Sequence, residues 1–294
     1  MWKQSAKSFA AYLEMIKVEH TVFALPFAFL GTFLAAYSMT GSWPAWSVIG
    51  WVLVAMTGAR SAAFGINRIF DRHIDARNPR TAKRAIPAGL LSVRSVWVFT
   101  VISFLLMLLA AAQLNPLALK LSPVAVFLLV IYSLTKRFTW LCHVILGITI
   151  ALAPLGGWLA VSGELPTAAW VLFVLVASWI AGFDILYATQ DESFDRAERL
   201  HSIPSRFGTV RSLQIAKWFH LLTVVCMFGM ISFVSLGWAY LAGAILCTII
   251  LIYEHAMLKP DDMSRLQVAF FTMNGLISTI LFVSTLLDLG VRIG

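Results

Sequence analysis

The sequence predicts an all-α membrane protein that crosses the lipid bilayer about nine times. Of its 294 residues, 60% are hydrophobic and only 12% are charged, and the mean hydropathy is +0.85. A soluble globular fold is excluded, because soluble domains carry about a quarter charged residues. Apolar runs of roughly 20 residues, enough for a helix to cross a ~30 Å hydrocarbon core, recur along almost the whole chain. We therefore expect one transmembrane domain, residues 1–294, with its helices around a central cavity.

Turn sequences divide the apolar runs into individual helices. Gly and Pro, which favour turns, separate the first run from the second at residues 41–44 (GSWP) and the fifth from the sixth at residues 162–166 (SGELP). The pairs at residues 115–116 (NP) and 236–237 (LG) likewise separate the third run from the fourth and the seventh from the eighth. The expected helices span residues 21–38, 46–66, 96–114, 117–133, 140–161, 168–186, 218–235, 238–255 and 268–287.

Longer, charged segments connect the helices on the other side of the membrane, above all residues 67–95 and 187–217. Of the 22 Lys and Arg residues, only Lys120 and Arg292 fall on the side of the short turns, and Arg60 lies inside a helix. Because positive residues concentrate on the cytoplasmic side, we expect the N-terminus and the charged loops to be cytoplasmic. Lipid headgroups or an anionic substrate explain the net charge of +8 better than nucleic acid does, since the basic residues alternate with membrane spans.

The first long segment begins with polar residues at helical spacing. Asn67, Asp71 and Asp75 follow one another at intervals of four residues. Arg60 precedes Asn67 by seven residues. If the second helix continues a turn or two past the membrane, these side chains share one face of it, so we expect them to converge on one site.

The sixth helix repeats this arrangement. Asp184, Asp191 and Asp195 are spaced by seven and four residues, and Tyr187 lies on nearly the same face. The two acidic pairs, Asp71 with Asp75 and Asp191 with Asp195, would then bring four carboxylates from two helices to face one another. Carboxylates this close repel unless a cation lies between them.

Mg²⁺ is the cation that these side chains favour, because hard oxygen ligands without neighbouring thiolates or imidazoles select it over zinc or copper. Mg²⁺ commonly combines one or two protein carboxylates with phosphate oxygens and water. A phosphate-bearing substrate is therefore expected. The basic residues suited to its remaining charge are Arg72, Arg77, Arg80, Lys83, Arg84, Lys136, Arg137, Arg196, Arg199 and Arg206.

Other interpretations of the charged clusters are open to test. The Asp and Arg residues could be a solvated surface whose ion pairs contribute ~0–1 kcal/mol each, but both clusters begin inside a span, at Arg60 and Asp184, where charge is costly. A secondary transporter would have its charges near the bilayer midplane, whereas these lie at the helix ends. A cation channel is disfavoured by the basic residues beside the carboxylates.

Three motifs in the chain resemble those of the UbiA superfamily of membrane prenyltransferases. They are N-x-x-x-D-x-x-x-D from Asn67, D-x-x-Y-A-x-x-D-x-x-x-D from Asp184, and YSLTKRFT at residues 132–139. The segment RTAKRAIPAG at residues 80–89 resembles the basic stretch that follows the first Asp motif in that family. The resemblance covers almost the whole chain and includes the helix count and the orientation.

This resemblance implies a Mg²⁺-dependent transfer of a polyprenyl group from its diphosphate to an aromatic acceptor, in the cytoplasmic (inner) membrane of a bacterium. Membrane lipids would surround the chain, and no obligate protein partner is expected. Tyr187 would stabilise the prenyl cation. The residues implied to bind Mg²⁺ are Asn67, Asp71, Asp75, Asp191 and Asp195, and those implied to hold the diphosphate are Lys83, Arg84, Tyr132 and Lys136.

The family members that act on 4-hydroxybenzoate have an acceptor pocket with an arginine on the second helix and an aspartate on the sixth. The resemblance therefore implies that Arg60 pairs with the carboxylate of the acceptor, and that Asp184 orients the acceptor or takes its ring proton. The motif LHSIP at residues 200–204 is similar to the branch that makes menaquinone through futalosine, which implies 1,4-dihydroxy-6-naphthoate instead of 4-hydroxybenzoate. Haem or a chlorin is a further alternative acceptor.

For the ionisable residues outside the motifs, we predict only where they lie relative to the membrane. His143 and His220 stand at predicted membrane boundaries, where we expect them to be interfacial. Glu254 and His255 begin a connection that also contains two aspartates, and we expect it to be a solvated loop.

Overall fold

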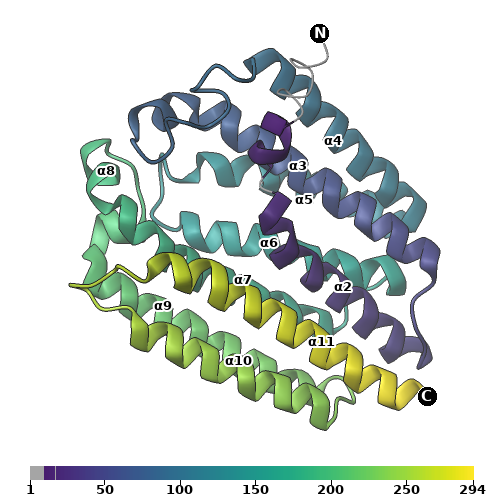
Figure 1. Ribbon diagram of the computed structural model, residues 1–294. Coiled ribbons are helices and arrows are strands. Elements are labelled where there is room, and N and C mark those ends of the chain that lie inside the picture. Colours follow the sequence, from purple (N-terminus) through teal and green to yellow (C-terminus); the bar gives the residue numbers. More distant parts are fainter. Residues whose placement is uncertain (1–9, 17) are drawn as a thin grey trace.

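The computed structural model describes residues 10–16 and 18–294, with side chains for residues 10–16 and 25–294. Residues 1–9, and with them the predicted cytoplasmic N-terminus, lie outside this part. Apart from one isolated bridge between Lys259 and Asp262, its regular elements are helices (Figure 1). They are α2 (Val18–Thr40), α3 (Trp46–Arg77), α4 (Val93–Leu114), α5 (Pro116–Thr135), α6 (Cys142–Ser162), α7 (Thr167–Ala188), η1 (Thr189–Asp191), α8 (Glu192–Ala197), α9 (Ile203–Gly229), η2 (Met230–Ser232), α10 (Trp238–Met257), η3 (Val268–Met273) and α11 (Asn274–Ile293).

The long helices occupy all nine of the predicted ranges. Within the described residues, eight of them are long and apolar enough to cross a membrane, and α2 occupies the remaining range. The predicted all-α, polytopic class is therefore confirmed.

Six helices pack into a closed set around the main apolar core. α2 packs on α6, α6 on α7 and α7 on α9, while α10 packs on α9 and α11, and α11 returns to α2. Their buried core includes Trp158, Trp179 and Tyr240. α3, α4 and α5 lie beside this set and pack on one another (Figure 1). Figure 1 also shows the loop after α3 near the same end of the bundle as α8.

α2 and α6 approach closely because glycines face backbone on both helices. A Cβ on Gly31 would collide with the carbonyl oxygen of Pro154, and a Cβ on Gly157 would collide with that of Ala28. Neither collision is with a flexible side chain, so a larger residue would have to push the helices apart.

Two helices extend further than the hydropathy alone indicates. α3 continues to Arg77, as the spacing of its polar residues predicts. α9 begins at Ile203 instead of residue 218, so the expected loop at 187–217 is mostly helical. Ser202 and Ser205 form a capping box at its start, with Pro204 in the first turn. These capping signals determine where α9 begins, whereas the apolar residues determine only which part of the helix lies in the membrane.

Candidate active site

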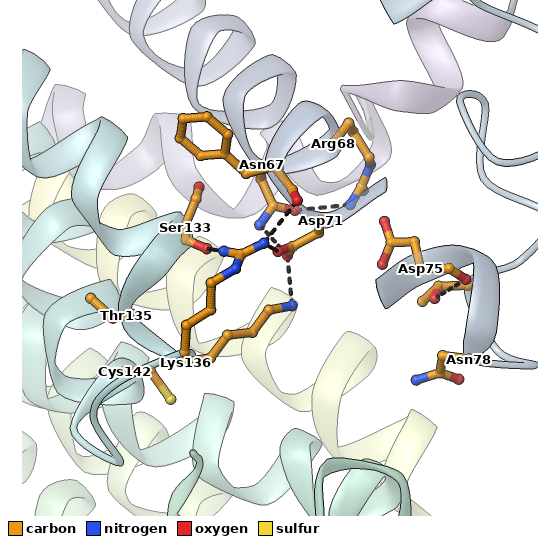
Figure 2. A network of polar contacts seen from close by, with 12 residues as sticks. Asn67, Arg68, Asp71, Asp75, Asn78, Ser133, Thr135, Lys136 and Cys142 are labelled. Carbon is orange, nitrogen blue, oxygen red and sulfur yellow. Dashed lines mark hydrogen bonds and ion pairs between the residues drawn. The ribbon is translucent and has the colours of Figure 1, made fainter. Parts of the chain in front are cut away.

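Asp71 lies near the end of α3 within a network of charged side chains. Its carboxylate is only 1% exposed and accepts a hydrogen bond from Asn67 Nδ2 at 3.1 Å. Lys136 Nζ and Arg137 Nη2 form ion pairs with it at 2.6 and 3.1 Å (Figure 2). Arg137 also donates to the backbone oxygen of Phe70 at 2.8 Å, which anchors the segment after α5 to α3.

Asp75, one turn further along α3, organises the loop that follows. Arg84 Nη1 is 2.7 Å from Asp75 Oδ1, and the Thr81 hydroxyl donates to the backbone oxygen of Asp75 at 3.0 Å. Asp75 Oδ2 is buried and has no hydrogen-bond partner among the described residues. One carboxylate oxygen therefore remains for a ligand.

Asp191 connects the second Asp motif to the loop after α3. Arg80 binds it through two nitrogens, Nε to Oδ1 at 3.1 Å and Nη2 to Oδ2 at 2.5 Å, and Asn78 Nδ2 donates to Oδ1 at 3.2 Å. Burial alone would lower the pKa of Arg80, but the hydrogen bonds and the charge of Asp191 outweigh it and raise the pKa above its usual value. Arg80 therefore stays charged and holds the two Asp motifs together.

The two Asp motifs line one small polar cavity of about 230 Å³. This outcome confirms the predicted convergence of α3 with the end of α7 and α8. The charged and amide residues in its wall are Asn67, Asp71, Asp75, Asn78, Arg80, Arg84, Lys136, His143, Asp184, Asp191 and Asp195.

A second, larger cavity of about 710 Å³ adjoins the first and is mainly apolar. Its walls come from α2 to α7, η3 and α11; within the described residues, α9 and α10 contribute none of its lining. The central cavity is therefore enclosed by fewer helices than the sequence predicts, because α9 and α10 pack behind α7 and α11.

Four residues line both cavities: Asn67, Tyr132, Leu146 and Asp184. We call these four the junction. The Tyr132 hydroxyl donates to the backbone oxygen of Ala63 on α3 at 3.4 Å, so α5 meets α3 here. At the junction, a charged compartment opens directly beside an apolar one.

The two predicted acceptor residues both line the apolar cavity. Arg60 lines the large cavity on α3, with its guanidinium carbon 4.9 Å from the centre of the Phe64 ring. Asp184 belongs to the junction, and its Oδ2 is 2.7 Å from Nδ1 of His143. A cation and a carboxylate thus border the apolar compartment.

Two residues predicted to bind substrate lie elsewhere. Lys83 is exposed and lines neither cavity, because the loop after α3 turns Arg84 inward and leaves its neighbour in solvent. Tyr187 also lines neither cavity. Its ring stacks on Phe270 with centroids 4.0 Å apart, and its hydroxyl accepts a hydrogen bond from Arg80 at 3.4 Å. Tyr187 therefore supports the wall of the site.

The expectations for three ionisable residues outside the motifs are wrong. His143 is buried against Asp184, and His220 is buried with its Nδ1 2.8 Å from Nε2 of His255. Glu254 is 1% exposed on α10 instead of lying in a solvated loop. An ionisable residue at the end of an apolar run gives the same sequence signal whether it faces lipid headgroups or another helix.

The polar cavity suits a hard divalent cation shared with a phosphate group. Among the described residues, no three His, Cys, Asp or Glu side chains lie close enough to hold a metal ion by themselves. Mg²⁺ often takes only one or two carboxylates from the protein and completes its coordination with phosphate and water. The buried Asp75 Oδ2, without a partner, fits that use.

Comparison with known proteins agrees with this geometry. The UbiA prenyltransferase family model matches residues 24–276. The chain is similar to a 4-hydroxybenzoate octaprenyltransferase of Vibrio campbellii, with 28% identity over 274 residues, 92% of this chain and 94% of that protein. A protein of the same name from Aliivibrio salmonicida is 32% identical over 238 residues, 79% of this chain and 81% of that protein.

Solved structures show the same arrangement of helices. A UbiA homolog from Aeropyrum pernix K1 matches with a TM-score of 0.83 and 30% identity, covering 92% of this chain and 98% of that one. A UbiA homolog from Archaeoglobus fulgidus bound to GPP and Mg²⁺ matches with a TM-score of 0.68 and 21% identity, covering 95% and 99%. Because its sequence identity is low, this second match supports the fold alone.

The membrane helices surround two adjoining cavities, one charged and one apolar. This arrangement is that of a polytopic membrane protein in which a site for a polar headgroup adjoins a site for an apolar chain. The chain belongs to the UbiA prenyltransferase family. The enzyme class expected from the sequence, a prenyltransferase, is confirmed at the level of the family.

Proposed function

We propose that this protein transfers a polyprenyl group from a polyprenyl diphosphate to a hydroxylated aromatic carboxylate, as a step of quinone biosynthesis. The observation that carries the proposal is the junction, where the polar cavity meets the apolar one. A polyprenyl diphosphate has the same two-part character. Its diphosphate fits the polar cavity, its tail fits the apolar cavity, and the bond that breaks lies at the junction.

Mg²⁺ would be held beside the diphosphate by both Asp motifs, with Asn67, Asp71 and Asp75 on one side and Asp191 and Asp195 on the other. Mg²⁺, when bound, offsets the negative charge of the diphosphate and stabilises the departing pyrophosphate. Two structures of a UbiA homolog from Archaeoglobus fulgidus, solved with Mg²⁺ and either GPP or DMAPP, support this assignment.

Arg84 and Lys136 contact the diphosphate oxygens. Both line the polar cavity and already hold carboxylates there, at 2.7 and 2.6 Å. Their charges stabilise the oxygen that leaves the allylic carbon, where negative charge develops as the bond ionises. Tyr132, at the junction, adds a hydroxyl near the same position.

The apolar cavity protects the allylic cation from water, which would otherwise capture it. Aromatic rings line this cavity close to the junction, among them Phe64 and Phe183. Such rings stabilise a cation that forms beside their faces.

The acceptor enters beside Arg60, which pairs with its carboxylate, and its electron-rich ring faces the junction. Asp184 takes the ring proton after the new carbon–carbon bond has formed. The names of the Vibrio and Aliivibrio relatives support 4-hydroxybenzoate, whereas the LHSIP segment at residues 200–204 supports 1,4-dihydroxy-6-naphthoate and menaquinone. Arg60 favours either acid over haem or a chlorin as acceptor.

We place the protein in the bacterial inner membrane as a single domain, with its N-terminus and both Asp motifs on the cytoplasmic side. The distribution of Lys and Arg supports this orientation. A water-soluble diphosphate headgroup and a water-soluble acid would then reach the site from the cytoplasm, while lipids surround the helices. The carboxylates lie at helix ends, which disfavours a secondary transporter.

The proposal is tested with the purified, detergent-solubilised protein, Mg²⁺, a polyprenyl diphosphate and one of the two acids, with the product followed by mass spectrometry. Prenylated product is expected, and it should disappear with EDTA and in the Asp71→Asn and Asp191→Asn variants. The preferred acid assigns the pathway. Absence of product with both acids refutes the acceptor class, and absence of diphosphate binding refutes the donor site.

A further inference from the structure

His143 and Asp184 form a buried pair at the junction that no family motif accounts for. His143 is the second residue of α6, and its Nδ1 lies 2.7 Å from Asp184 Oδ2 on α7. The side chain of Asp184 is 25% exposed, whereas that of His143 is 5% exposed. Asp184 therefore faces both cavities, whereas His143 is more deeply buried and lines only the polar one.

The residues before and after His143 fix the position of this part of α6. One turn after His143, Gly147 lies so close to α7 that a Cβ would collide with the backbone oxygen of Ala177. Just before it, Cys142 Sγ donates to the backbone oxygen of His201 at 3.4 Å. The backbone of His143 is consequently held in place independently of Asp184.

The surroundings of the ring indicate which nitrogen carries the proton. His143 Nε2 is buried and has no hydrogen-bond partner among the described residues. Nδ1 carries the proton that lies between the two residues and donates it to Asp184 Oδ2, because a carboxylate oxygen accepts.

We propose that His143 is a positioning residue for Asp184 in the deprotonation of the prenylated ring, an inference that rests on the proposed function. After the new bond between the ring carbon and the prenyl carbon has formed, the ring C–H bond breaks. Its electron pair restores the aromatic ring, and the proton moves to Asp184 Oδ1. The hydrogen bond from His143 to Oδ2 orients the carboxylate of Asp184 and turns Oδ1 toward the junction.

The test compares His143→Asn, which keeps an N–H donor near the position of Nδ1, with His143→Leu and His143→Ala, which have none. Each is measured alone and with Asp184→Asn. Two rates are followed at saturating substrates, formation of the prenylated acid and loss of prenyl diphosphate without acceptor. The second rate reports diphosphate ionisation, a step in which the ring proton takes no part.

His143→Leu and His143→Ala should lower turnover by about tenfold or more, because a misplaced base loses rate steeply with distance. The acceptor-independent rate should fall much less than turnover does, because it does not depend on the ring proton. His143→Asn should recover most of the turnover. In the Asp184→Asn background, loss of His143 should add less than about a twofold effect, since the two residues act as one unit.

Three results would overturn the inference. His143→Asn could be as impaired as His143→Ala, or the effects of His143 and Asp184 could multiply fully, or the acceptor-independent rate could fall in parallel with turnover. A wild-type protein that ionises the diphosphate but prenylates neither acid would instead refute the proposed acceptor class, so the two failures are distinguishable.

Discussion

At the scale of single residues, Asp75 and Arg84 form a buried ion pair whose loss is measurable. Asp75 is 3% exposed, and one of its oxygens has no other partner among the described residues. Arg84→Ala would leave that carboxylate without its cation. We expect the free energy of unfolding to fall by about 1–3 kcal/mol, seen as a lower melting temperature in detergent without divalent cations.

Arg77→Ala is the matched control for this prediction. Arg77 pairs with Glu198 at 2.8 Å, but its side chain is 58% exposed. A surface pair of this kind contributes about 0–1 kcal/mol. Equal losses in the two variants would contradict the view that burial makes the Asp75 pair costly to break. Restoration of the Arg84→Ala protein by Mg²⁺ would support a cation site at Asp75.

Glu254 provides a second residue-level prediction, because both of its carboxylate oxygens are buried without a hydrogen-bond partner in the described part of the chain. Its side chain lies against Asn274. Glu254→Gln removes the acidic group while keeping the shape, so we expect stability to rise by about 1–2 kcal/mol. Glu164→Gln, at an exposed position, should leave the melting temperature unchanged. A fall in stability for Glu254→Gln would show that the carboxylate has a function there.

The residues that sequence analysis located correctly are those whose signal lies within one helix. Asp71 and Asp75 share a face of α3 because of their spacing, and the same holds for Arg60 and Asn67. His143 and Glu254 could not be assigned in this way, since their surroundings come from other helices, Asp184 on α7 in one case and Asn274 on α11 in the other. Such pairing depends on tertiary packing, which hydropathy does not report.

At the scale of elements, the contact between α2 and α6 depends on Gly157. Gly157→Ala places a methyl group against the backbone of Ala28, which we expect to destabilise the fold by about 1–3 kcal/mol. Gly156→Ala is the matched control, because nothing lies within 4 Å of a Cβ there. It should be neutral or stabilise α6 by up to ~1 kcal/mol. Thermal unfolding of the two variants, changed at adjacent positions, separates packing from helix propensity.

The ends of the elements were harder to predict than their number. Polar spacing indicated that α3 continues a turn or two past residue 66, and it ends at Arg77, whereas α9 was expected to begin fifteen residues later than Ile203. Arg206 and Arg211 lower the hydropathy of its first part, and the helix is kinked between them at Gly208, where φ is 80°. The Ser202 capping box and Pro204 were present in the sequence as start signals, so attention to capping would have corrected this boundary.

At the scale of the whole molecule, the apolar cavity follows α3 from Asn67 back to Val52, which is about 22 Å at 1.5 Å per residue. Polyprenyl donors of different length would therefore occupy different depths of one tunnel. Because both Asp motifs lie at one end, the headgroup stays in place while the tail extends along the bundle. Selection among donors should consequently depend on residues far from the chemistry.

Ala55 tests this arrangement, since it lines the apolar cavity about three turns from Asn67. Ala55→Phe fills the far part of the tunnel and leaves the polar cavity untouched. We expect kcat/KM for a long polyprenyl diphosphate to fall by about tenfold or more, and that for a ten-carbon donor to change by less than about threefold, because a blocked tunnel penalises only the buried part of the tail. Ala55→Val, a smaller change at the same position, should give an intermediate loss with the long donor. Equal losses for both donors would mean that the tail leaves the protein by another route, and that the apolar cavity does not measure its length.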